Sequence, residues 1–345
     1  MGLFKRRGAR EAAAVEVAER RPDLSDDYPD STDELLAEIA RLTAENRLSR
    51  DLERERRLLW LRHYAGIRAI ETAAGDVDYV APDAAGLPAQ RLPEIAGSDV
   101  TAAIMRAGIL RDGCLLVRGL VDRDTALGFA DTIDRSFAAR AAGEADDGLY
   151  DEFDPPSTFA VAAVRPWIQD GGGVLATDAP RATFAMLELF AAAGLPQLVG
   201  DYLGEPPLLS VHKTTLRKAD PAVGGAWHQD GAFMGDVRAL NLWLSLSHCG
   251  DDAPGLDLVP RRVDEVVIEH HAMLDVELTR ERARRAAGDA GIVRPIFEPG
   301  DALFFDELFL HQTASDPAMP NPRFAIESWF FGGSAFPLDY APLAV

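Results

Sequence analysis

Three side chains in the C-terminal half of the chain could bind one metal ion. His228 and Asp230 stand two positions apart in the motif WHQDG at 227–231. Residues two apart on a strand project to the same face, so an imidazole nitrogen and a carboxylate oxygen could reach the same ion. His311 follows the apolar run 302–310, from which a second strand could supply the third ligand.

Two histidines and one carboxylate indicate a particular kind of metal chemistry. They occupy one face of an octahedron and leave three positions open, which suits Fe(II) enzymes that bind a co-substrate and O2 together. A zinc hydrolase using the same residues is an alternative, although no general-base carboxylate stands near the motif. The His-x-Asp pattern is weak alone, because the chain has 7 His and 56 Asp and Glu residues. The other interpretation is a histidine hydrogen-bonded to a nearby carboxylate.

The composition excludes several classes of partner. With 35 Lys and Arg against 56 Asp and Glu, the net charge of −21 disfavours nucleic acid and anionic membranes. A small neutral or cationic substrate is easier to accept than a polyanion, unless a local basic pocket overrides the overall field. Two cysteines are too few for a disulfide scaffold, so we expect a cytoplasmic protein. No apolar run reaches the ~18 residues of a membrane span.

The N-terminal part differs in character from the rest of the chain. Residues 1–30 mix basic and acidic stretches and predict a flexible tail. Residues 31–75 predict a long helix that begins at a capping box, Ser31 with Glu34. Its apolar stripe breaks at Asn46, so sustained heptads are absent. The alternatives are a homodimer through a coiled coil or a helix packed on its own domain.

The main domain is expected at 76–345. A strand is predicted at 113–118 and a helix at 124–137, followed from about 208 by short apolar runs between Pro, Gly and Asp clusters. These runs are 208–216, 239–247, 302–310 and 324–331. The order predicts an α+β fold with a mainly β, jelly-roll-like core.

Several segments together resemble the phytanoyl-CoA dioxygenase family of Fe(II)- and 2-oxoglutarate-dependent oxygenases. They are WHQDG at 227–231, LWL at 242–244, GL at 255–256, VP at 259–260, PGDALFF at 299–305, His311 and NPR at 321–323. The similarity covers roughly residues 95–335. It implies a double-stranded β-helix (a jelly-roll or cupin-like barrel) flanked by helices, with His228, Asp230 and His311 as the iron ligands.

The resemblance also implies residues that bind 2-oxoglutarate. Arg323 would pair with its distal carboxylate, which suits a guanidinium fork; the alternative is a surface arginine. Trp243 would line the co-substrate pocket, or it is simply a core residue. His212 and Thr214 would touch the metal-bound end of 2-oxoglutarate, although His212 could equally be a satisfied core histidine.

The implied function is a dioxygenase that hydroxylates a small molecule and releases succinate and CO2. A carboxylate at Asp230 favours hydroxylation or another oxidation, since related halogenases have a small residue there. The chain departs from the family pattern at Arg261, Arg262 and Ala325, near the pocket. No substrate is therefore implied, acyl-CoA included. The alternative is a non-catalytic ligand-binding or assembly protein on the same barrel.

Overall fold

The computed structural model describes residues 29, 31–143, 147–234, 237–267 and 279–345, so the predicted tail lies almost wholly outside the described residues. The helices are α2 (Thr32–Leu48), α3 (Leu52–Thr72), α4 (Ala102–Asp112), α5 (Arg123–Ala142), α6 (Val161–Asp170), α7 (Pro180–Ala192), α8 (Leu195–Leu203), the single turn α9 (Gly231–Met234) and α10 (Arg280–Ala287). Short 3-10 turns occupy Ala84–Gly86, Gly97–Asp99, Ala176–Asp178, Gly288–Ala290 and Gly333–Ala335. The strands are β1 (Glu94–Ala96), β2 (Cys114–Arg118), β3 (Gly173–Leu175), β4 (Pro207–Ala219), β5 (Ala239–Ser245), β6 (Gly255–Leu258), β7 (Ala302–Phe305), β8 (His311–Ala314), β9 (Arg323–Gly332) and β10 (Pro342–Ala344).

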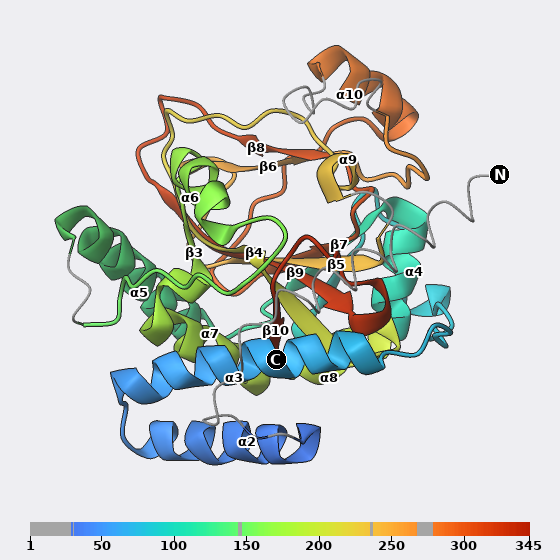
Figure 1. The fold of residues 1–345 in the computed structure, drawn as a ribbon. Helices are drawn as coiled ribbons and strands as arrows, with labels where there is room; N and C mark the ends of the chain where they lie inside the picture. Colours follow the sequence, from blue (N-terminus) through green and yellow to red (C-terminus); the bar gives the residue numbers. More distant parts are fainter. Residues whose placement is uncertain (1–28, 30, 144–146, 235–236, 268–278) are drawn as a thin grey trace.

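The strands form a large sheet and a small one. The main sheet has the order β1-β2-β7-β5-β9-β4-β10, and β3 also pairs with β4. The pairs are antiparallel, except for β1 with β2. The small sheet is the antiparallel pair β6-β8. In Figure 1 it lies on one side of the main sheet, whereas α7 and α8 lie on the other. The predicted mixture of helices around a mainly β core is confirmed.

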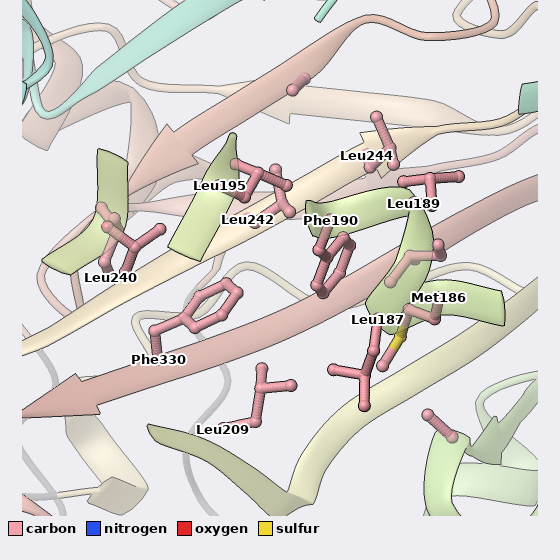
Figure 2. Packing of buried hydrophobic residues seen from close by; sticks show 14 of the residues in the cluster. Met186, Leu187, Leu189, Phe190, Leu195, Leu209, Leu240, Leu242, Leu244 and Phe330 are labelled. Atoms are coloured by element: carbon pink, nitrogen blue, oxygen red, sulfur yellow. The ribbon is translucent and has the colours of Figure 1, made fainter. Parts of the chain in front are cut away.

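Leucine alternation on β5 fixes which face of the main sheet is apolar. Leu240, Leu242 and Leu244 are fully buried against side chains of α7 and α8, such as Phe190 and Leu195 (Figure 2). The leucine face of β5 thus packs on the layer formed by α7 and α8. Among the described helices, none alone is long and apolar enough to cross a membrane; the pair α7 and α8, bent by 74°, meets that test only together.

Strand β4 changes its pattern partway along. Its register with β9 shifts between Leu209 and Thr214. The apolar core on the side of the main sheet that faces α7 and α8 is called the helix-side core. Val211 and Leu216 both belong to it, although an odd number of positions separates them. Since side chains alternate on a regular strand, the irregularity exchanges the two faces of β4 between these residues.

The N-terminal segment contains two helices where one long helix was predicted. The Ser31 hydroxyl accepts from the Glu34 amide at 3.1 Å, so this half of the capping box is confirmed. The chain leaves the helical conformation at Ser49, and the Asp51 side chain then caps α3 by accepting from the Arg54 amide. A new capping residue so close to the first helix explains why the apolar stripe breaks there.

The apolar stripe of α2 is buried within the chain itself. Figure 1 shows α2 and α3 side by side, with α3 next to the body of the molecule. The residues of this cluster are Leu35, Ile39, Leu42, Leu58, Leu61, Tyr64, Ala65 and Phe184, the last from α7. Packing on the chain's own domain accounts for the stripe that suggested a coiled coil, and a homodimer remains a prediction.

Polar bonds also attach α3 to the C-terminal strand. The His63 ring nitrogen Nδ1 lies 2.8 Å from the Pro342 carbonyl, and Arg62 donates to the Ala344 carbonyl at 3.0 Å. Burial lowers the pKa of His63 to about 4, so this ring is neutral at pH 7. The two N-terminal helices therefore belong to the folded body that carries β10.

A matched pair of leucine substitutions tests this packing. Leu35 is 0% exposed and Leu48 is 89% exposed on the same helix. We expect Leu35→Ala to lower the free energy of unfolding by about 2–5 kcal/mol, because it leaves a cavity. The same change at Leu48 should cost less than about 0.5 kcal/mol. Denaturant titration measures both, and equal losses would contradict the packing of α2 against α3.

Candidate metal centre

Backbone pairing brings two histidines together from distant parts of the chain. The His228 amide donates to the His311 carbonyl at 3.0 Å, and the His311 amide donates to the His228 carbonyl at 3.1 Å. This reciprocal pair places His228 next to His311 of β8, so the segment around His228 is joined to the small sheet. It brings the two imidazole rings close together, with centroids 4.4 Å apart and ring planes tilted by 53°.

Asp230 joins the histidines because it shares the strand face of His228. Its Oδ1 lies 3.6 Å from His228 Nε2, and one donor atom from each of the three residues falls within 4.8 Å of the others. Gln229 points the opposite way and bonds to the Leu308 carbonyl at 2.7 Å and to the Val267 amide at 2.9 Å. The structure therefore brings together the three predicted metal ligands.

Hydrogen bonds leave the metal-binding nitrogen of each histidine free. His228 Nδ1 lies 2.8 Å from the Ala226 carbonyl, and His311 Nδ1 lies 3.1 Å from the Phe309 carbonyl. Because a carbonyl only accepts, Nδ1 of each ring carries a proton, and Nε2 is the nitrogen left to bind a metal. Burial and the neighbouring His228 ring lower the pKa of His311 to about 4. Two imidazoles oriented by Nδ1 hydrogen bonds beside a carboxylate fit a divalent iron ion.

The three residues open onto a cavity of about 370 Å³ between the two sheets. Strands β4, β5 and β9 line it on the main-sheet side, and β6 and β8 on the other. Its polar and charged lining includes Lys213, Thr215, Arg217, Asn241, Arg323 and Glu327. The side chain of Trp243 also lines it, as the alternation on β5 predicts. The cavity therefore has cations opposite the metal-binding group.

Arg323 is buried at the start of β9, with only 1% of its surface exposed. Its guanidinium lies 5.2 Å from the Trp243 ring and donates to the Gly255 carbonyl at 3.2 Å. Its Nε finds no hydrogen-bond partner among the described residues. The alternative of a surface arginine is wrong, and a buried guanidinium with an unsatisfied donor suits a carboxylate ligand.

The sequence analysis missed two charged residues beside Arg323. Glu327 lies 3.9 Å from the Arg323 guanidinium and accepts from Arg217 Nε at 2.8 Å. Burial alone would raise the pKa of Glu327, but the two guanidiniums outweigh it and hold that pKa below its usual value. Arg217 also donates to the Gly171 carbonyl at 2.8 Å. Alternation on β9 could have revealed Glu327, since it is an even number of positions beyond Arg323.

His212 and Thr214 do not line the cavity, and this prediction is wrong. The His212 ring accepts from the Ala341 amide at 3.2 Å through Nδ1, and its Nε2 lies 2.5 Å from the Phe159 carbonyl. Burial lowers its pKa to about 4. His212 is thus the satisfied core histidine of the alternative interpretation. Thr214 donates to the Ser210 carbonyl at 2.8 Å.

The irregular register of β4 is the physical reason for that error. A regular strand would carry His212 and Thr214 on the face toward the metal-binding group. Because the faces exchange between Val211 and Leu216, the cavity receives Lys213, Thr215 and Arg217 instead.

A second group with metal-binding residue types lies at the surface. It contains His248, Asp251 and Asp252. Both ring nitrogens of His248 already bond to carboxylates, at 2.9 Å to Glu298 and 2.8 Å to Asp251. This histidine serves an exposed ion-pair network. His270 and His271 lie outside the described residues.

Comparison with known proteins identifies the family. The family model described as phytanoyl-CoA dioxygenase (PhyH) matches residues 109–316, more than half of the chain. The chain belongs to this family of Fe(II)- and 2-oxoglutarate-dependent oxygenases. The cofactors expected from the sequence, Fe(II), 2-oxoglutarate and O2, are those of the family. No curated protein matches the chain by sequence.

Solved structures resemble the chain more distantly. EctD from S. alaskensis, solved with 2-oxoglutarate and 5-hydroxyectoine, is 18% identical, with 76% of this chain and 85% of that chain covered and a TM-score of 0.48. AviO1 from Streptomyces viridochromogenes Tue57 is 16% identical over 69% and 97% of the chains, with a TM-score of 0.46. The non-heme alpha ketoglutarate dependent carbocyclase SnoK from nogalamycin biosynthesis is 11% identical over 69% and 86%, also at 0.46. Likeness at this level identifies neither substrate nor reaction.

Calorimetric titration of the metal-stripped protein with Fe(II) under anaerobic conditions tests the metal centre. We expect one ion per chain and an affinity at least about tenfold lower in Asp230→Ala, because a charged ligand is lost. Asp251→Ala removes the same group from the surface cluster and should bind as the original protein does. The reverse pattern would place the ion at His248 and disprove the assignment.

Proposed function

We propose that the chain is a dioxygenase that hydroxylates a small molecule, using Fe(II) and 2-oxoglutarate and releasing succinate and CO2. The observation that carries this proposal is the group of three donor atoms within 4.8 Å that shares one cavity with the buried Arg323. In the proposal, His228, Asp230 and His311 hold the iron. Arg323 binds the distal carboxylate of 2-oxoglutarate, and Trp243 packs beside it.

Each residue has a separate task in this arrangement. When bound, iron and 2-oxoglutarate supply the oxidation, in which O2 provides one oxygen atom to the product and one to succinate. The Nδ1 bonds of His228 and His311 fix the orientation of each ring, so that Nε2 would be the nitrogen that holds the iron. Arg323 sets the position of 2-oxoglutarate through paired hydrogen bonds. The aromatic rings of Trp243 and Trp329 exclude water from the cavity wall.

The proposal extends to the organisation of the chain. Residues 76–345 form the oxygenase domain, built as a double-stranded β-helix, and residues 31–75 form a helical segment that supports it. Two sheets that face each other across the cavity support this assignment. The bonds from α3 to β10 support a structural role for the helical segment.

The competing function is a barrel that binds a ligand without catalysis. The two are separated by measuring succinate formed from 2-oxoglutarate by the Fe(II)-loaded protein, across a panel of candidate small molecules. A catalyst forms succinate that depends on Fe(II), on 2-oxoglutarate and on an added substrate. No succinate above the level of Asp230→Ala with any compound would favour the non-catalytic barrel.

Arg323→Gln tests the co-substrate site. We expect it to weaken 2-oxoglutarate binding to the Fe(II)-loaded protein by about 10- to 100-fold, because a charged hydrogen-bond pair is lost. Iron affinity should stay unchanged, since Arg323 is on the main sheet and the ligands are not. Anaerobic calorimetry measures both affinities. The control is Arg123→Gln, which changes an exposed arginine of α5. Equal 2-oxoglutarate affinity in the original protein and in both variants would remove Arg323 from the site.

A further inference from the structure

One cation in the cavity, Lys213, forms no hydrogen bond or ion pair with the described residues. Lys213 lies on the cavity face of β4 and is half-buried, so a ligand in the cavity can reach its ammonium group. Within the described part of the chain, no side chain or carbonyl accepts a hydrogen bond from it. Its ammonium nitrogen instead lies 4.0 Å from the Phe233 ring centroid and 5.9 Å from that of Tyr340. Aromatic faces offset only part of the cost of removing an ammonium group from water.

The other charges of the cavity are already matched. Arg217 is bonded to Glu327. The proposed function assigns Arg323 to 2-oxoglutarate and Asp230 to the iron. Asp220 is exposed at the rim, and its carboxylate accepts the Ala222 amide at 2.8 Å. Among the described residues, Lys213 therefore remains the lining cation that forms no ion pair, with the Asp230 and Glu327 carboxylates acting on it only at longer range. Its pKa is lowered by burial, against the opposing effect of the Asp230 carboxylate.

Apolar side chains also line the cavity, and Phe233 lies beside Lys213. Phe233, Val223 and Ile168 line the cavity, and Phe233 and Val223 are 37% and 46% exposed. Trp167, the neighbour of Ile168 on α6, is 53% exposed. Large apolar side chains exposed together at a cavity are typical of a surface that binds the apolar part of a ligand.

We propose that the substrate is a small organic acid with an apolar body, and that Lys213 binds its carboxylate. A monoanion matches the single uncompensated charge, whereas a phosphate dianion would bring a second negative charge that no free cation meets. This inference rests on the proposed function, because iron accounts for Asp230 and 2-oxoglutarate accounts for Arg323. It also reverses the preference for neutral or cationic substrates that the net charge of −21 suggested, since the cavity carries its own local cation.

Matched acids and amides test the proposal. The probes are phenylacetate, 3-phenylpropionate and 4-phenylbutyrate, each with its primary amide, titrated anaerobically by calorimetry into protein loaded with Fe(II) and 2-oxoglutarate. At least one acid should bind about tenfold or more tightly than its amide. Lys213→Met should abolish this preference without changing the affinity for the amide. Lys213→Arg keeps the charge and should retain the preference.

Lys218→Met is the matched control, because Lys218 is on the same strand but bonds to Asp134 outside the cavity. It should behave as the original protein does. The proposal is overturned if no acid binds, if acids and amides bind alike, or if the preference survives in Lys213→Met. It is also overturned if Lys213→Met weakens 2-oxoglutarate binding about tenfold, since Lys213 would then belong to the co-substrate site.

Titrating the same acids and amides without iron and 2-oxoglutarate measures the Lys213 anion site independently of the proposed oxygenase function. A preference for the acid that depends on Lys213 but is accompanied by no 2-oxoglutarate-dependent succinate would disprove the proposed function and retain the anion site. If succinate is formed but acid binding does not depend on Lys213, the anion site is disproved and the oxygenase function is retained.

Discussion

Two backbone hydrogen bonds between His228 and His311 are the constraint on which the rest of the site depends. They set the spacing and direction of both imidazoles, and Asp230 follows from them by strand alternation. Gln229 fixes the same segment from its other side through the Leu308 carbonyl. The metal-binding group therefore lies on the small sheet and on the segment that pairs with β8.

The groups that suit anionic ligands come from the main sheet instead. Arg323 and Glu327 are on β9, and Lys213 is on β4. The distance between the two sheets thus determines how far the metal-binding group lies from the guanidinium. That distance is maintained by the apolar cluster between the sheets, which joins Trp243 of β5 to Leu256 and Leu258 of β6. One face of β5 stabilises the fold and the other lines the cavity, so packing and chemistry are separated on a single strand.

Local sequence patterns indicate the side-chain direction of residues on regular strands, because direction there alternates from one residue to the next. His228 with Asp230, the leucine face of β5 and the lining position of Trp243 all follow from regular alternation. His212 and Thr214 were misplaced because the register shift in β4 exchanges its faces, and nothing in the sequence of that strand marks the shift. An irregularity stabilised by pairing with β3, β9 and β10 depends on long-range contacts, which a local pattern does not contain.

The charged cavity residues that were not predicted from the sequence also depend on contacts between segments far apart in the chain. Glu327 shares its face with Arg323, so alternation alone could place it in the cavity, but its partner Arg217 comes from a strand far away in the sequence. Lys213 could be placed only after the register shift was known. The overall charge of −21 was similarly uninformative about the cavity, because salt screens exposed charges beyond about 8 Å whereas buried ones interact within the site. A half-buried ammonium group that forms no ion pair with the described residues costs folding stability, which its contact with the Phe233 ring offsets only in part. Such a cost is expected where a site is selected for its ligands rather than for the stability of the chain alone.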